Sequence, residues 1–360
     1  MKAAVLYDYN HPLKVESLSL NAPGPGEVLV KIHSTGVCHS DWHVIKGDWP
    51  HVPLPTVLGH ETSGVIEDIG SGVKTVQVGD HVILTWKPGC GRCEMCQLGH
   101  ISVCDEVPSV KSLPVSSESG SVVNQLVGLG GFATHTVVPE WAAVSVDRDV
   151  PFPQKALVGC AVTTGVGSVI NTAKVQQGST VSVFGCGGVG LSCIQGAKIA
   201  GADKIIAVDI KENKLDMAIE FGATHTVNSQ NVDPVEKIRE LSDGLGTHYS
   251  FEAIGVVEKT LVQSVECTRK KGVTVWVGAP PVGLDVTLDS RSLVFEKSIL
   301  GSYIGSARPH IDFPKMLKLY KNGMLKLDEM LSQSHPIEDI NLAFDAMKRG
   351  EVARSVITFE

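Results

Sequence analysis

Apolar and polar positions alternate near the start of the chain. One face of this segment would carry Val28, Val30 and Ile32, and the other Leu29, Lys31 and His33. This alternation predicts a strand with one face more buried than the other. Glycines then punctuate further short apolar runs, such as the one at 82–84. Residues 1–150 are therefore predicted to form compact, barrel-like β structure.

The pattern changes near residue 160, where strand-like and helix-like segments begin to alternate. Strands are predicted at 180–184, 204–208, 226–227, 249–251 and 273–277, and helices up to about residue 200 and at 211–221. Repeated β–α–β units predict a parallel sheet covered by helices on both faces.

A third pattern begins after residue 295. Ile337, Ile340, Phe344 and Met347 mark one face of a helix that Gly350 would end, and 355–359 resemble a strand. This tail is too short to be a domain, so we expect it to pack on the first one. The predicted division is 1–160, 161–297 and 298–360.

Composition narrows the possible partners. The chain has 360 residues, enough for about two domains, and a net charge of −8 that argues against nucleic acid or an anionic membrane as a partner. No run of about 18 apolar residues could span a bilayer, and an acid at Asp8 interrupts any signal-peptide core. We expect a cytoplasmic protein.

A glycine-rich turn follows the strand predicted at 180–184. Gly185, Gly187, Gly188, Val189 and Gly190 lie in a G-x-G-x-x-G pattern that opens a helix, and Asp209 closes the next strand. This context predicts a dinucleotide site, with the pyrophosphate at the helix N-terminus and the acid on the adenosine ribose. The charge of Asp209 would repel a 2′-phosphate, which favours NAD over NADP.

Four of the nine cysteines lie close together in the sequence: Cys90, Cys93, Cys96 and Cys104. Four thiolates are a common ligand set for structural zinc, and two-residue gaps let neighbouring sulfurs converge on one ion. The spacing does not match ferredoxin-type iron–sulfur patterns. A set of free thiols is the alternative to a structural zinc site.

A second, dispersed set consists of Cys38, His60 with the adjacent Glu61, and Cys160. Two cysteines and one histidine form a known catalytic zinc site that keeps one coordination position open. Each of these residues alone is more often structural. The hypothesis depends on their occurrence together with a dinucleotide site.

These residues resemble the zinc-containing alcohol dehydrogenases of the medium-chain dehydrogenase/reductase family over essentially the whole chain. The resemblance lies in 36–43 (GVCHSDWH), 59–61 (GHE), the four-cysteine loop, 131–133 (GFA), Cys160, the glycine turn with Asp209, and 354–359 (RSVITF). It implies an α/β protein in which a doubly wound Rossmann sheet is inserted into a GroES-like β-barrel catalytic domain. It also implies an enzyme with two zinc ions per chain, one catalytic and one structural, that transfers a hydride reversibly between a primary alcohol and NAD.

The resemblance also implies residue roles. Cys38, His60 and Cys160 match catalytic zinc ligands, Asp41 the carboxylate that orients His60, and Glu61 an acid behind the metal. Ser40 and His43 match a proton relay. His39, Lys214 and Arg354 match positions that meet the cofactor, and the family often has arginine at the position of His39. Trp49, Trp86, Phe132 and Ala279 match walls of the substrate pocket.

Several alternatives stay open. Two indoles would narrow the pocket, whereas Ser40 and Ala279 leave room, so benzyl or terpenoid alcohols compete with small ones. A polyol dehydrogenase is disfavoured because such enzymes commonly have an acid in place of Cys160. A glutathione-adduct formaldehyde dehydrogenase is another alternative. Such an enzyme needs a basic residue for the glycine carboxylate of glutathione, and no such residue can be identified in this sequence. A non-catalytic nucleotide-binding relative is the alternative outside catalysis. The stretch from Cys104 to Gly130, which has few apolar residues over 112–120, is predicted to be a surface loop of intermediate length, and it leaves both a homodimer and a homotetramer possible.

Overall fold

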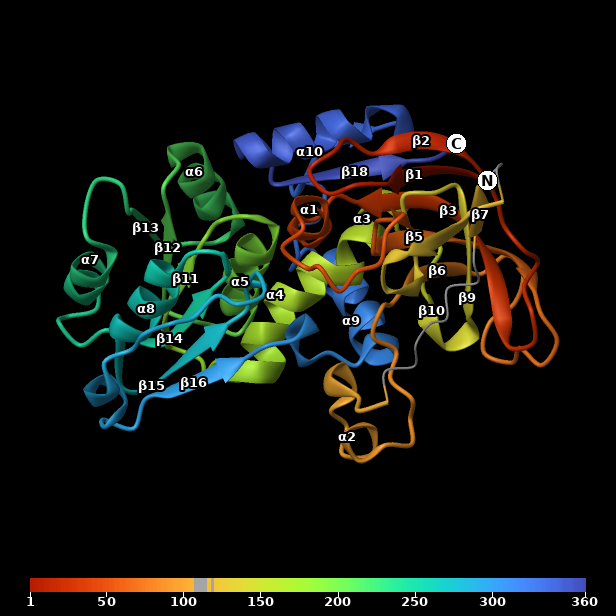
Figure 1. The fold of residues 1–360 in the computed structure, drawn as a ribbon. Helices are drawn as coiled ribbons and strands as arrows, with labels where there is room; N and C mark the ends of the chain where they lie inside the picture. The colour runs from red at the N-terminus through yellow and green to blue at the C-terminus, as the bar shows by residue number, and fades with distance from the viewer. Residues whose placement is uncertain (107–114, 118–119) are drawn as a thin grey trace. The chain divides into compact units, whose positions relative to one another are not determined.

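The computed structural model describes residues 1–106, 115–117 and 120–360 of the chain. The chain divides into two compact units (Figure 1). The first, the catalytic unit, contains Met1–Cys160 and Arg308–Glu360, and the second, the nucleotide unit, contains Ala161–Ala307. No helix among the described residues has both the length and the apolar character to cross a membrane.

The catalytic unit is built on two β structures. A closed barrel contains, in spatial order, β1 (Lys2–Leu6), β2 (Lys14–Ser19), β7 (Val115–Ser117), β8 (Val122–Gln125) and β4 (Thr56–Val57). A second sheet runs β10 (Ala143–Ser145), β6 (His81–Leu84), β5 (Glu61–Ile69), β3 (Glu27–Gly36), β18 (Arg354–Thr358) and β17 (Leu331–His335), with β9 (His135–Pro139) also paired to β3. Buried and half-buried residues alternate strictly along the first eight positions of β3, as the sequence predicts.

The helices of the catalytic unit are α1 (His39–Lys46), α2 (Glu94–Gln97), α3 (Phe152–Leu157), α9 (Pro309–Lys321) and α10 (Ile340–Arg349). The predicted C-terminal helix is confirmed: Ile340 and Phe344 of α10 lie in one apolar cluster with Ile337, and Met347 packs against it. Gly350 ends the helix with a left-handed φ of 66°. Because β18 pairs antiparallel with β3, the tail does return to the first part of the chain.

The nucleotide unit contains a six-stranded parallel sheet. Its spatial order is β13 (His225–Asn228), β12 (Lys204–Asp209), β11 (Thr180–Phe184), β14 (Thr247–Glu252), β15 (Thr268–Trp276) and β16 (Ser298–Gly301). The connecting helices are α4 (Thr163–Gly167), α5 (Gly188–Ile199), α6 (Glu212–Phe221), α7 (Pro234–Leu241) and α8 (Glu258–Glu266). This is the strand order of a Rossmann fold, and the predicted fold class is confirmed.

One domain boundary and one loop differ from the sequence prediction. The return to the catalytic unit begins at Arg308 and not at 298, because β16 pairs parallel to β15 and so extends the nucleotide sheet. The loop predicted over 112–120 lies partly outside the described residues, and within it residues 115–117 form β7, which pairs with β2 and β8.

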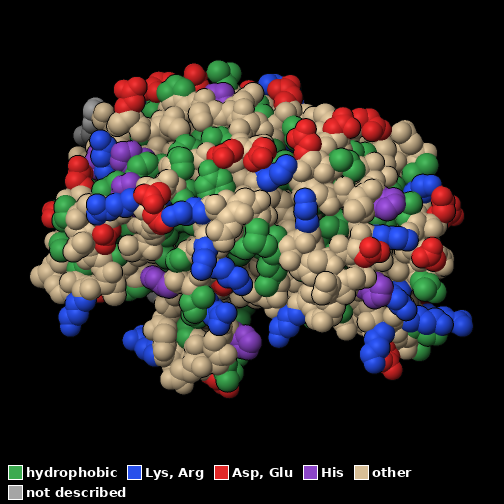
Figure 2. All heavy atoms as spheres, turned by 180° about the vertical axis from the view of Figure 1, so that it is seen from behind, with side chains coloured by type: hydrophobic (Ala, Val, Ile, Leu, Met, Phe, Trp, Pro, Cys, Tyr) green, Lys and Arg blue, Asp and Glu red, His purple; other side chains and the backbone are tan. Residues whose placement is uncertain are grey.

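On the face shown in Figure 2, acidic and basic side chains are intermingled.

Candidate active site

The dispersed ligands meet in the catalytic unit. Cys38, His60, Glu61 and Cys160 are buried, and one ligand atom from each lies within 4.8 Å of the others. Cys38 precedes α1, His60 and Glu61 stand at the start of β5, and Cys160 lies in a π-helical turn after α3. The chain therefore brings three separate segments to one buried point.

The chemistry of this group fits a zinc ion. Nδ1 of His60 lies 3.2 Å from Oδ1 of Asp41, which also accepts a hydrogen bond of 2.9 Å from the Gly59 amide. Nε2 of His60 is buried and makes no hydrogen bond within the described part of the chain. A buried polar atom without a partner is costly, and a metal ion bound with the two sulfurs would satisfy it. Asp41 thus lies where the sequence places it, on the far nitrogen of the predicted ligand.

The electrostatics favour a thiolate at this group. A hydrogen bond with the Cys160 thiol is the main cause that holds the pKa of Cys38 well below its ordinary value, and the positive charges of His60 and Arg354 act in the same direction. A thiolate is the form of cysteine that binds metal.

Glu61 is a buried acid with one partner. Burial raises the pKa of its carboxyl to about 8, against the opposing charge of Arg354, whose Nη2 donates to Oε2. Oε1 is buried and makes no hydrogen bond among the described residues, so one carboxylate oxygen is available at the ligand group. Gly36 makes room for this carboxylate, because a Cβ there would lie 2.1 Å from Oε2. The sequence names Gly36 only as the first residue of the 36–43 motif and indicates no role for it.

Arg354 was predicted to meet the cofactor. Within the catalytic unit it is 5% exposed and is paired with Glu61, while its Nε makes no hydrogen bond among the described residues. The cofactor role stays a prediction, and the pairing with Glu61 is a feature that the sequence did not indicate.

The predicted relay residues lie on α1, directly after Cys38. Ser40 is half-buried and His39 is exposed, whereas His43 is buried. Nδ1 of His43 lies 2.8 Å from Oδ2 of Asp48, which the sequence reading missed. The signal that could have found it is Gly47, a helix-ending residue between the two.

Two of the predicted pocket residues contact residues of this site. The Trp86 ring meets the His60 ring edge-on, with centroids 6.3 Å apart, and Trp49 stacks on His43 at 5.0 Å. Phe132 is fully buried and packs against Phe344 in an apolar cluster of the catalytic unit, so its exposure gives no support to a pocket role. Ala279 lies half-buried in the nucleotide unit.

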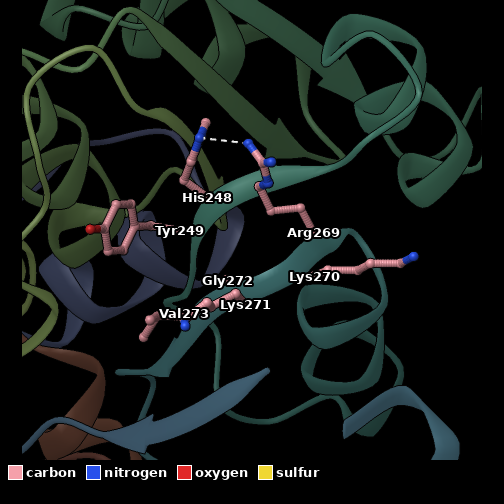
Figure 3. Close-up of a pocket in the computed structure, with 7 residues that line it drawn as sticks. All are labelled: His248, Tyr249, Arg269, Lys270, Lys271, Gly272 and Val273. Atoms are coloured by element: carbon pink, nitrogen blue, oxygen red, sulfur yellow. Dashed lines mark hydrogen bonds between the residues drawn. The ribbon is translucent and has the colours of Figure 1, made fainter. Parts of the chain in front are cut away.

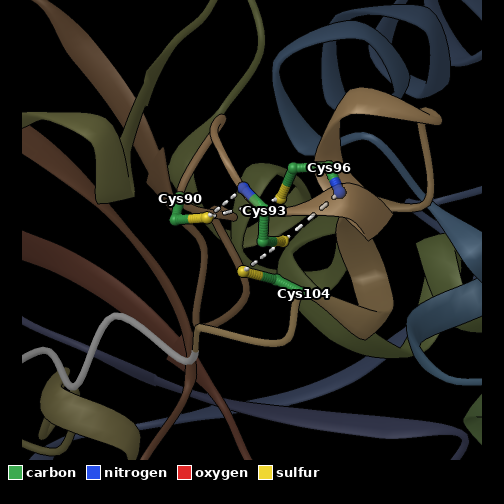
Figure 4. Close-up of side chains that lie close together, drawn as sticks. All are labelled: Cys90, Cys93, Cys96 and Cys104. Atoms are coloured by element: carbon green, nitrogen blue, oxygen red, sulfur yellow. Dashed lines mark hydrogen bonds between the residues drawn. The ribbon is translucent and has the colours of Figure 1, made fainter.

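The four-cysteine group is also assembled (Figure 4). The Sγ atoms of Cys93 and Cys104 lie 3.7 Å apart, and those of Cys90 and Cys96 lie 4.0 Å apart. A tetrahedron with metal–sulfur bonds of about 2.3 Å has sulfur–sulfur edges of about 3.8 Å, so these separations fit zinc. The amide of Cys96 donates to the Cys93 sulfur and is the main cause that lowers the pKa of that thiol to about 6.

The glycine turn of the nucleotide unit has the three properties that a dinucleotide site needs. Gly185 has a φ of +88°, and a Cβ at Gly190 would lie 1.7 Å from the Gly185 carbonyl oxygen, so this residue allows α5 to approach β11. At Gly187, in contrast, a Cβ would meet nothing within 4 Å. This open space, at the N-terminus of α5, is where a pyrophosphate would approach the backbone.

Asp209 lies beside this turn. Its Oδ2 accepts a 2.8 Å hydrogen bond from the Cys186 amide, and Oδ1 accepts one of 2.7 Å from Ile210. Lys214 is on α6, with only 7% of its surface exposed. Burial is the main cause that raises the pKa of the nearby Cys186 thiol. The charge of Asp209 also raises this pKa, whereas the charge of Lys214 lowers it.

A hollow at the other end of the same sheet is a different feature (Figure 3). It is lined by residues at the amino ends of β14 and β15, among them His248 and Arg269, whose Nε2 and Nη1 atoms lie 2.8 Å apart. The glycine turn is at the carboxyl end of β11, so this hollow is not the predicted nucleotide site.

Comparison with known proteins agrees with both units. Residues 24–148 match the model of the alcohol dehydrogenase GroES-like domain, and residues 188–322 match that of zinc-binding dehydrogenases. An S-(hydroxymethyl)glutathione dehydrogenase of Paracoccus denitrificans is 36% identical, with 99% of each chain covered. A class-3 alcohol dehydrogenase of Dictyostelium discoideum is 37% identical over 99% of this chain and 97% of its own. The chain belongs to the zinc-containing alcohol dehydrogenase family.

Solved structures of this family extend the likeness to three dimensions. The benzyl alcohol dehydrogenase of Acinetobacter calcoaceticus has a TM-score of 0.93 and 36% identity, and 100% of this chain and 99% of that one are covered. The predictions of an enzyme, of an alcohol oxidoreductase and of zinc as its metal are confirmed, and the non-catalytic alternative is set aside.

Proposed function

We propose that this alcohol dehydrogenase oxidises a primary alcohol to the aldehyde, reversibly, with NAD as hydride acceptor. The observation that carries the proposal is the buried group of Cys38, His60, Glu61 and Cys160, in which the trio of two sulfurs and one imidazole would hold a catalytic zinc ion. Trp86 beside His60 provides an apolar wall at that point.

Separate side chains are proposed to bind the metal, orient its ligand, transfer the proton and contact the cofactor. Zinc bound by the trio supplies the Lewis acidity that makes a hydroxyl group acidic near neutral pH. Asp41 holds the ring of His60 in one orientation through Nδ1. His43 holds and releases the alcohol proton at its imidazole, and Ser40 lies between His43 and Cys38 in the sequence of α1. His39, Lys214 and Arg354 are proposed to contact the cofactor.

NAD is proposed over NADP because of Asp209. Its carboxylate stands at the carboxyl end of β12, beside the glycine turn where the adenosine ribose of a dinucleotide binds. A 2′-phosphate there would face a like charge. A measured preference for NADP would remove this part of the proposal.

The second candidate substrate class is benzylic. It is favoured by the full-length likeness to a benzyl alcohol dehydrogenase and by the half-buried Ala279, a small residue at a predicted pocket position. Trp49 and Trp86 would favour smaller alcohols. The substrate class is therefore the quantity to measure.

The test is NADH formation, followed by absorbance, with ethanol, hexanol, benzyl alcohol and geraniol, each with NAD and with NADP. S-(hydroxymethyl)glutathione is added as a fifth substrate because two of the similar proteins are named S-(hydroxymethyl)glutathione dehydrogenases. Zinc content is measured on the same sample, with two ions per chain expected. Turnover of one or more primary alcohols with NAD supports the proposal, whereas no turnover by a zinc-loaded sample overturns it.

We propose a homodimer or homotetramer as the assembly. β16 is an edge strand of the nucleotide sheet, and apolar side chains near it are exposed, with Val294 at 73% and Phe295 at 45%. An edge strand with exposed apolar neighbours is a template for pairing with another chain. A monomer by light scattering at assay concentration would refute this. The cytoplasmic location stays a prediction.

A further inference from the structure

The turn that ends α1 brings an acid beside the predicted relay histidine. Gly47 adopts φ 81° and ψ 14°, a left-handed conformation that glycine reaches without strain, and its amide donates to Val44. The Asp48 amide donates to the His43 carbonyl oxygen at 2.9 Å. The chain therefore reverses after Lys46, and the side chain of Asp48 returns to the preceding turn of the helix.

His43 is held on two sides. Its Nδ1 lies 2.8 Å from Oδ2 of Asp48, and its ring stacks on Trp49 with an interplanar angle of 18°. Lys46 donates to the same Oδ2 at 3.1 Å. Nε2 is therefore the ring nitrogen that remains for exchange, since no other hydrogen bond of this ring occurs in the described part of the chain.

The charge state of Asp48 fixes the tautomer of His43. Burial acts to raise the pKa of Asp48, but the hydrogen bonds from His43 and Lys46 outweigh it and leave the pKa below its ordinary value. An ionised carboxylate only accepts hydrogen bonds, so Nδ1 must carry a proton and Nε2 a lone pair. Tyr9 packs against Gly47, but its hydroxyl donates to the carbonyl oxygen of Val52.

We propose that Asp48 is a positioning residue for His43, which it holds in the Nδ1–H tautomer so that Nε2 takes the alcohol proton. The inference rests on the proposed relay function. In the step, a proton leaves the alcohol oxygen through the relay that begins at the Ser40 hydroxyl, which passes on its own proton in exchange, and a new N–H bond forms at Nε2. This gives an imidazolium whose Nδ1–H stays bonded to Asp48. The proton then leaves Nε2 to solvent, and Asp48 itself is never protonated.

The first experiment reads the tautomer without any turnover. In the zinc-loaded enzyme labelled with ¹⁵N in histidine, the His43 signals are assigned by their loss in His43→Gln. At a pH where the ring is neutral we expect a protonated Nδ1 and an unprotonated Nε2, and a reversed or mixed pattern in Asp48→Asn. A protonated Nε2 in the wild-type protein would overturn the proposal.

The second experiment is a double-mutant cycle in alcohol oxidation. Asp48→Asn is expected to lower kcat/KM at neutral pH by roughly tenfold to a hundredfold, at or below the lower end of the roughly hundredfold or more that a whole general base contributes. In the His43→Gln background the same substitution should have no further effect.

Two variants complete the design. Lys46→Gln removes a cation from the same carboxylate oxygen but leaves the contact of Asp48 with His43, so the tautomer of His43 should stay as in the wild-type protein. Asp345→Asn, which breaks an exposed ion pair with Lys348 on α10, is the matched control and should change nothing. An Asp48→Asn loss that persists at full size in His43→Gln would mean a structural role and overturn the inference. If no alcohol is turned over, the proposed function fails, while the tautomer measurement still decides the role of Asp48.

Discussion

Replacing Lys155 by methionine is expected to stabilise the protein at neutral pH. Lys155 on α3 is fully buried, and its ammonium forms no ion pair with a carboxylate among the residues that the structure describes. Nζ lies 2.8 Å from Nδ1 of His81 and 4.7 Å from the centroid of the Phe152 ring. His33 stacks on that ring at 4.2 Å. The cation is thus enclosed by aromatic rings and is poorly solvated.

The magnitude follows from the pKa of this amine. Burial lowers it from 10.5 to about 8, although the charges of Asp147 and Asp149 act in the opposite direction. A depression of that size corresponds to about 3 kcal/mol of unfolding free energy at about 1.4 kcal/mol per unit. Below pH 8 both the folded and the unfolded chain carry the proton, so the folded protein bears the whole cost. Between pH 8 and 10.5 the unfolded chain binds more protons, so stability rises with pH.

Methionine is also unbranched, is one heavy atom shorter than lysine and carries no charge. The variant loses the hydrogen bond to His81, worth about 1 kcal/mol, so we expect a net gain of about 2 kcal/mol at pH 7. At pH 10 the folded amine is neutral while the unfolded amine is still mostly protonated, so most of the cost of burial is recovered and the gain should shrink to about zero.

The assay is urea unfolding followed by circular dichroism at pH 7 and at pH 10, with equal zinc and protein concentrations. Lys318→Met, on an exposed position of α9, is the control and should stay within about 0.5 kcal/mol at both pH values. An equal destabilisation by Lys155→Met at both pH values would refute the reasoning, because it would mean that the ammonium is well solvated or paired.

Three further predictions concern the sites. Gly190→Ala should abolish NAD binding in a fluorescence titration, because its Cβ would lie 1.7 Å from the Gly185 carbonyl oxygen; wild-type affinity would mean that α5 can move away at little cost. Cys93→Ser should lower the zinc content from two ions per chain to one and reduce the thermal midpoint, and an unchanged metal analysis would contradict a zinc site in this loop. Trp86→Ala should raise the ratio of kcat/KM for benzyl alcohol over ethanol by about tenfold, the scale of a changed apolar pocket contact, and a constant ratio would place this indole outside the pocket despite its contact with His60.

The sequence was most informative for the sites whose residues lie close together along the chain. The glycine turn could be read because strand, turn and helix follow one another, and Gly185, Gly187 and Gly190 have the distinct environments that its spacing requires. The four-cysteine loop could be read for the same reason, since two-residue gaps place the sulfurs of Cys90 and Cys93 within reach of one ion. Neither prediction needs long-range information.

The catalytic group could be predicted only from the occurrence of its residues together with a dinucleotide site and from the family resemblance. Nothing local relates Cys38 to Cys160, and each alone fits an ordinary core position. The structure also revealed contacts that no spacing indicates, such as that of Arg354 with Glu61, which forms because β18 pairs with β3 and β3 pairs with β5.

By itself, then, the sequence determined the class of fold, the glycine turn and the chelating loop, because backbone geometry fixes the relation of residues a few positions apart. Tertiary structure decided which distant side chains share an environment: the assignment of β16 to the nucleotide sheet, the enclosure of Lys155 and the meeting of His60 with Cys160. The physical reason is that strand pairing and apolar burial act on whole faces, so the neighbours of one polar group depend on how all the elements pack together.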